Sequence, residues 1–259
     1  MNRFVALAIV SLGLSLPAIG QTPATTAATS ASPARVPDVP ALPTADKILA
    51  RYIEALGGRE AWQKLNARIS KGTIEVPAMN LSGTVEMREK APNSMLALLL
   101  INGAAYRQGF NGSVGWADDP QNGLREMAGA ELEETRRDSD FYHPLDLKKI
   151  YSKFTVSGME KIRERDAYVV EAALAEGGAD TLYFDVQSGL VLRIVSQHHT
   201  PEGVITFMED LSDYRAVDGV TLPFTVHQSS EESDFTIRFS DIRHNMSLED
   251  AQFSKPAAQ

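Results

Sequence analysis

The chain has 259 residues, 43% of them hydrophobic, and carries a formal net charge of -9. This length supports one domain with a substantial core, and the acidic balance argues against nucleic acid and anionic membrane surfaces as main partners. The chain contains no cysteine, which excludes disulfides, thiolate metal sites and cysteine nucleophiles.

The first residues predict export from the cytoplasm. Arg3 precedes an apolar run over residues 4–16, which leads into a small-residue cleavage site at Gly20. This pattern is typical of a cleavable signal peptide over residues 1–20, and the run is too short to span a bilayer. Because Gln21 stands where a lipoprotein signal would place cysteine, we expect no lipid anchor. A periplasmic or secreted bacterial protein is therefore expected.

The folded domain is expected to span residues 44–256, after a disordered tether over 21–43 that is rich in Ala, Thr, Ser and Pro. A helix is predicted over Asp46–Leu56, because its apolar residues recur on one stripe after the N-cap Thr44. A shorter helix is predicted over Glu60–Leu65. Alternating apolar and polar residues then predict the first strands.

The stretch from Ser94 to Trp116 contains two Asn-Gly pairs, a sequence that favours two-residue type I′ hairpins. Three antiparallel strands are predicted, over Met95–Ile101, Ala104–Phe110 and Ser113–Ala117. Two-residue turns define the register of the facing residues. The predicted pairs are Leu99 with Tyr106, Met95 with Phe110, and Arg107 with Trp116.

Both faces of this three-stranded unit are apolar, whereas an antiparallel sheet normally buries one face and exposes the other to water. The second face therefore needs a cover or a ligand. We predict that it lines a hydrophobic cavity and binds a ligand through Leu96, Leu98, Leu100, Arg107, Val114 and Trp116. The single charge, Arg107, has two interpretations. It forms a cation–π contact with Trp116 that joins two strands, or it meets a lipid head group or ester.

The second half of the domain is predicted to be a helical insertion followed by a strand meander. Helices are expected over Ala128–Arg137 and Pro144–Tyr151, and an insertion of this length is often a lid. Turn residues at regular intervals then separate seven strands. These are predicted over Thr155–Arg163, Ala167–Leu174, Thr181–Val186, Leu190–Gln197, Val204–Tyr214, Val220–Gln228 and Phe235–Arg243, and a short segment over Ser247–Phe253 closes the domain.

No catalytic motif is visible in the sequence. It has no nucleophile elbow, P-loop, dinucleotide fingerprint or His-Glu-x-x-His motif. The adjacent His198 and His199 would point to opposite faces of a strand, and the turn over residues 118–123 lacks the ligands of a calcium loop. We therefore expect neither an enzyme nor a metal or other cofactor.

The order of motifs along the domain resembles that of a known family. The motifs are Ala55-Leu56-Gly57-Gly58, the stretch from Gly112 to Trp116, Leu182-Tyr183-Phe184-Asp185 with Gly189-Leu190, and Asp213-Tyr214-Arg215 with Asp218-Gly219-Val220 and Pro223. They resemble the outer-membrane lipoprotein-sorting superfamily, which includes the periplasmic carrier LolA, its receptor LolB and mycobacterial lipid-binding lipoproteins. The resemblance spans about Thr44 to Pro256.

This resemblance implies a mainly β protein of the α+β class, an unclosed antiparallel half-barrel with helices covering its mouth. It also implies a cavity for acyl chains and a role as a periplasmic carrier or sensor of lipid, lipidated protein or other amphiphilic ligands. The alternative is a non-enzymatic envelope interaction module, in which the helices fill the half-barrel permanently and the outer surface docks an envelope protein. The lid-locking arginine of the carriers has no counterpart in a recognisable motif, since Arg51, Arg59, Arg136 and Arg137 all lie on predicted helices.

Overall fold

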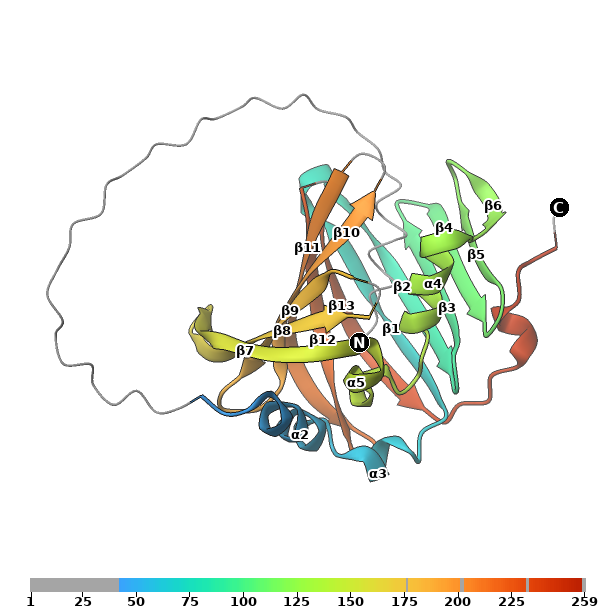
Figure 1. The fold of residues 1–259 in the computed structure, drawn as a ribbon. Coiled ribbons are helices and arrows are strands. Elements are labelled where there is room, and N and C mark those ends of the chain that lie inside the picture. Colours follow the sequence, from blue (N-terminus) through green and yellow to red (C-terminus); the bar gives the residue numbers. More distant parts are fainter. Residues whose placement is uncertain (1–41, 176, 201–202, 232, 258–259) are drawn as a thin grey trace, which may run out of the picture.

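The computed structural model describes residues 42–175, 177–200, 203–231 and 233–257 (Figure 1). The predicted signal peptide and all but the last two residues of the predicted tether lie outside these ranges. No helix in the described part of the chain has the length and apolarity needed to cross a membrane.

Thirteen strands of the described chain form one antiparallel sheet, as expected for a mainly β protein. The strands are β1 (Ala67–Val76), β2 (Leu81–Lys90), β3 (Ser94–Ile101), β4 (Ala104–Asn111), β5 (Gly115–Asp119), β6 (Gly123–Glu126), β7 (Tyr151–Ile162), β8 (Arg165–Leu174), β9 (Ala179–Asp185), β10 (Val191–Thr200), β11 (Gly203–Val217), β12 (Val220–Ser229) and β13 (Asp234–His244). The helices are α2 (Ala45–Ala55), α3 (Arg59–Trp62), α4 (Gly129–Asp138) and α5 (Leu147–Ile150), with 3-10 turns η1 (Pro77–Met79), η2 (His143–Leu145) and η3 (Asp250–Phe253).

The strand order explains why the sheet is a half-barrel with a covered mouth. The chain enters at β1 in the middle of the sheet and reaches one edge at β6 by successive hairpins. The insertion with α4, η2 and α5 then carries it to the opposite edge at β7, and the meander returns to β13, which pairs with β1. The two edges thus stay apart, and the insertion connects them across the open side (Figure 1).

The register of the first Asn-Gly hairpin is confirmed. Leu99 lies opposite Tyr106 and Met95 opposite Phe110. Asn102 and Gly103 have φ values of 47° and 86°, as a type I′ turn requires.

The predicted pairing of Arg107 with Trp116 is wrong. Trp116 lies opposite Gly109, and Arg107 lies opposite Asp118. The cause is the side chain of Asn111, whose Oδ1 accepts hydrogen bonds from the backbone N–H groups of Ser113 (3.0 Å) and Val114 (2.8 Å). This side chain stabilises a longer loop than the two-residue turn, because Asx-type bonds compete with hairpin geometry.

The observed register depends on the absence of a side chain at Gly109. A Cβ atom at this position would lie 2.5 Å from the indole of Trp116. We expect Gly109→Ala to lower the free energy of unfolding by about 1–3 kcal/mol, because the indole has to shift. Gly158→Ala is the matched control, since a Cβ there meets no atom within 4 Å. Urea unfolding measures the stability of both variants. Equal stabilities would contradict the close approach of Gly109 to the indole of Trp116.

One face of the sheet is apolar from β4 through β1 and β13 to β7, and we call it the inner face. Over β7–β12 it packs against Tyr52 of α2, Trp62 of α3 and Phe141 of the insertion. Over β1–β4 and β13 it forms a second cluster around Ile74 and Phe235. The helices therefore lie over the inner face, and the opposite face is the outer face.

Candidate functional site

The inner face and its helical cover border a cavity of about 70 Å³. We call it the inner cavity. Tyr52 and Leu56 lie on or directly after α2, and Trp62 on α3. Strands β1, β2, β11, β12 and β13 supply most of the remaining lining, which is mainly apolar and includes Val226 and Ile237. A mainly apolar space of this kind favours hydrocarbon as a ligand.

A buried ion pair forms part of the cavity wall. Arg68 on β1 lies opposite Glu89 on β2, and its Nε and Nη2 donate to the two carboxylate oxygens at 2.5 and 2.6 Å. Both side chains are less than 10% exposed. The guanidinium also lies 5.9 Å from the ring centre of Trp62 and 5.7 Å from that of Phe141. These contacts join the first hairpin to both parts of the helical cover.

Two tyrosines, Tyr52 and Tyr214, also line the inner cavity, together with Glu209. Burial raises the pKa of Tyr52 and of Tyr214, and the charge of Glu209 adds to both shifts. The two hydroxyls are therefore neutral over the whole physiological pH range. Tyr214 donates its hydroxyl hydrogen to the carbonyl oxygen of Val191 at 2.7 Å.

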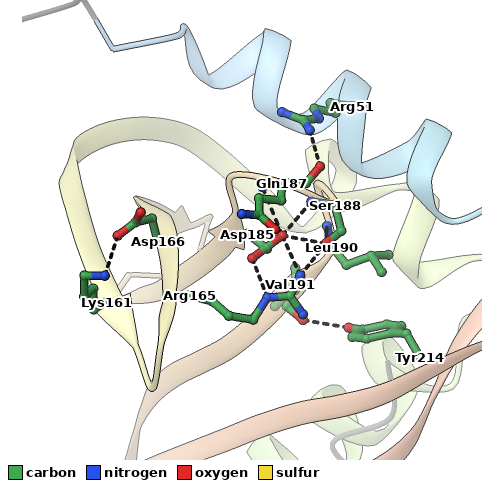
Figure 2. Close-up of polar contacts among 10 residues, drawn as sticks. All are labelled: Arg51, Lys161, Arg165, Asp166, Asp185, Gln187, Ser188, Leu190, Val191 and Tyr214. Carbon is green, nitrogen blue, oxygen red and sulfur yellow. Dashed lines mark hydrogen bonds and ion pairs between the residues drawn. The ribbon is translucent and has the colours of Figure 1, made fainter.

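Helix α2 is attached to the sheet through two turns. At the first, Arg51 donates to the carbonyl oxygen of Gln187 at 2.5 Å (Figure 2). Asp185 holds this turn by accepting from the backbone N–H of Ser188 and from Arg165. Burial alone would raise the pKa of Asp185, but these hydrogen bonds outweigh it and hold the pKa below its usual range. Loss of this carboxylate would therefore loosen the seat of α2.

The second attachment of α2 is made by its C-terminal end. The carbonyl oxygen of Leu56 accepts from the backbone N–H of Thr221 at 3.0 Å. Gly57 has a φ of 101°, and a Cβ there would lie 2.3 Å from the carbonyl oxygen of Gly219. Only glycine permits this close approach, so the end of α2 is fixed to the β11–β12 turn.

The insertion is held over the cavity by hydrogen bonds to the β2–β3 connection and to the segment around α3. Phe141 donates its N–H to the carbonyl oxygen of Pro92 at 2.9 Å, and the Tyr142 hydroxyl donates to the carbonyl oxygen of Leu65 at 2.9 Å. Arg59 on α3 donates to the carbonyl oxygen of Leu145 and to Asp146 at 2.6 and 2.9 Å. Arg59, the first residue of α3, thus joins α3 to the insertion.

The six residues predicted to bind a ligand do not line the inner cavity. They belong to the outer face or to the loop beside it, and they are Leu96, Leu98, Leu100, Arg107, Val114 and Trp116. The structure brings Leu96 and Trp116 together in a buried cluster, with Leu98 packed against it.

The cover of this cluster is the segment around η3. Leu248 and Phe253 pack on Leu96 and Trp116, and the indole N–H of Trp116 donates to the carbonyl oxygen of Phe253 at 2.9 Å. Leu98 packs partly against the same cluster. The outer face is thus covered here by the chain itself.

The other predicted residues lie nearer to solvent. Leu100 is 49% exposed and Val114 37% exposed. Arg107 donates to the carboxylate of Asp118 on β5. Their role in binding a ligand stays a prediction.

The sequence did carry a signal for the missed cavity residues. Arg68 lies on the same face of β1 as Ile74 and Val76. Glu89 lies on the same face of β2 as Val85 and Met87. A charged residue on the apolar face of each of two successive strands indicates a buried pair. Within the described residues, no group of three or more His, Asp or Glu side chains is arranged to hold a metal ion.

The sequence matches no family model and no curated protein. Several solved structures share the fold, among them the following three. A DUF1329 family protein from Desulfovibrio piger has a TM-score of 0.56 at 15% identity, over 81% of this chain and 96% of its own. A domain assigned to outer membrane lipoprotein sorting from Vibrio parahaemolyticus has a TM-score of 0.52 at 17% identity, over 82% and 98%. A LolA superfamily protein from Nitrosomonas europaea also has 0.52, at 12% identity, over 83% and 99%. The resemblance to the lipoprotein-sorting superfamily is therefore confirmed for the fold, the unclosed half-barrel with helices.

Proposed function

We propose that this protein binds the acyl chains of lipids or lipidated proteins in its inner cavity, as a carrier or sensor in the bacterial cell envelope. The observation that carries the proposal is the mainly apolar cavity between the inner face of the sheet and the layer of helices that covers it. Two findings support it. The predicted signal peptide indicates export, and the Vibrio parahaemolyticus structure with the same fold is assigned to lipoprotein sorting.

The size of the cavity sets a condition on this function. At about 70 Å³ it is smaller than typical ligand sites of about 300–1,000 Å³. An acyl chain therefore requires the cover or a side chain of the wall to move. The same observation favours the alternative, an interaction module whose half-barrel is filled by its own helices.

A cavity-filling substitution tests where a ligand binds. Ser70 lines the inner cavity and is 4% exposed. We expect Ser70→Phe to weaken binding of a fluorescent fatty acid at least about tenfold, because the ring occupies the space of the chain, at a cost of about 1–3 kcal/mol in stability. Titration of the purified protein measures the affinity.

Ser82→Phe is the matched control, since Ser82 is exposed and lies on the outer face of β2. It should bind the probe as the wild type does. Equal binding by both variants would exclude the inner cavity as the site. A wild-type protein that binds no probe, and that carries no lipid in native mass spectrometry after isolation from the periplasm, would favour the interaction module.

A further inference from the structure

A second and larger cavity lies between the start of β10 and the middle of β11. Its volume is about 330 Å³, and we call it the vestibule. Its floor is apolar, with Leu190, Leu192 and Leu211 at most 9% exposed. The exposed side chains of Arg163 and Arg165 stand at its rim. The vestibule therefore has the size and the apolar floor of a site for part of a hydrocarbon chain.

The vestibule lies where two neighbouring strands separate. The pairing of β10 with β11 ends at Arg193 opposite Asp210, although β11 continues to Val217 beside β12. On the N-terminal side of Arg193, β10 leads back to the Asp185 turn. On the C-terminal side of Asp210, β11 contains Asp213 with a φ of 53°. The sheet thus has an opening here that its hydrogen-bond ladder does not close.

One residue is shared by the linings of the vestibule and the inner cavity. Tyr214 lines both spaces. Its hydroxyl crosses the opening to the carbonyl oxygen of Val191, the 2.7 Å hydrogen bond drawn in Figure 2. If the ring turned away from Val191, the two spaces would join into one cavity of the size that ligand sites have.

We propose that this opening is a side portal, through which a single-chain amphiphile passes from the vestibule into the inner cavity, and that Tyr214 is its gate. The proposal rests on the function proposed above, because it needs a ligand in the inner cavity. In the closed state the hydroxyl hydrogen bond holds the ring in place. One such bond contributes about 0.5–1.5 kcal/mol, which corresponds to a roughly two- to tenfold difference in how often the gate is open.

Stopped-flow binding of a fluorescent fatty acid tests the gate. Tyr214→Phe removes only the hydroxyl, so association and dissociation should both become about two- to tenfold faster, with nearly unchanged affinity. Tyr142→Phe is the matched control, because it removes the same kind of hydrogen bond, to the carbonyl oxygen of Leu65, from the insertion. It should leave both rates unchanged.

A second variant closes the portal. Ser212 lines the vestibule, and Ser212→Trp should slow association at least about tenfold by filling it. Ser240→Trp is its control, since Ser240 is exposed and lines neither cavity. Faster binding in Tyr142→Phe alone, or unchanged rates in both Tyr214→Phe and Ser212→Trp, would overturn the portal while leaving the proposed function intact. A wild-type protein that binds no probe would overturn the proposed function and the portal with it.

Discussion

Replacing Glu89 with alanine should lower the free energy of unfolding by about 3–5 kcal/mol. The substitution leaves the guanidinium of Arg68 buried, 7% exposed, without the carboxylate that accepts its two hydrogen bonds. Removal of one partner from a buried pair costs more than the pair contributes, because the remaining charge is not solvated. Urea unfolding followed by circular dichroism measures the loss.

The control for this prediction replaces both charges together. Arg68→Met with Glu89→Leu should be close to neutral or more stable than the wild type, because apolar residues of similar volume need no solvation. A loss below about 1 kcal/mol in Glu89→Ala would contradict the dry cavity wall, since water would then solvate the guanidinium. The double variant also separates roles. If it binds the fatty acid normally, the pair supports the wall and does not hold the ligand.

Two features that depend on neighbouring residues, the first Asn-Gly turn and helix α2, were predicted correctly from the sequence. The type I′ turn at Asn102-Gly103 defines the pairing of Leu99 with Tyr106, because both strands start at the turn itself. Helix α2 begins after Thr44, whose hydroxyl accepts from the N–H of Lys47 at 3.4 Å, and it ends within one residue of the prediction. Periodicity and capping residues are local signals, so a single sequence contains them.

The inner cavity was not predicted, because residues far apart in the chain form it. Tyr52, Arg68 and Tyr214 come from α2, β1 and β11, and the pairing of β13 with β1 brings β1 and β11 into one sheet. The side of the sheet that the helices cover is also a property of the whole fold, so two apolar faces looked alike in the sequence. The order of family motifs did lead to the half-barrel, because it reports topology rather than the position of single side chains.

The error at Arg107 shows how one side chain changes a site. A two-residue turn at Asn111-Gly112 would place the guanidinium beside Trp116. The Asx-type bonds of Asn111 lengthen the loop, so the indole moves to Gly109 and Arg107 reaches Asp118. Both arrangements keep the two residues on the outer face, because the shift is by two residues and strand side chains alternate with a period of two.

Replacing Trp116 with alanine should lower the free energy of unfolding by about 3–5 kcal/mol. The indole is 2% exposed, packs with Leu96 and Phe253, and donates to the carbonyl oxygen of Phe253. Its loss leaves a cavity beneath the η3 segment and an unmade hydrogen bond. Urea unfolding measures the change in stability.

Two comparisons complete this experiment and decide which face binds the ligand. Phe253→Ala removes the other side of the same contact and should cost a similar amount, whereas Val114→Ala, at a 37% exposed loop position, should change stability by less than about 0.5 kcal/mol. Because the inner cavity lies on the opposite face, Trp116→Ala protein that is still folded should bind the fatty acid with wild-type affinity. Loss of binding in this folded variant would instead place the ligand on the outer face, among the six residues predicted from the sequence.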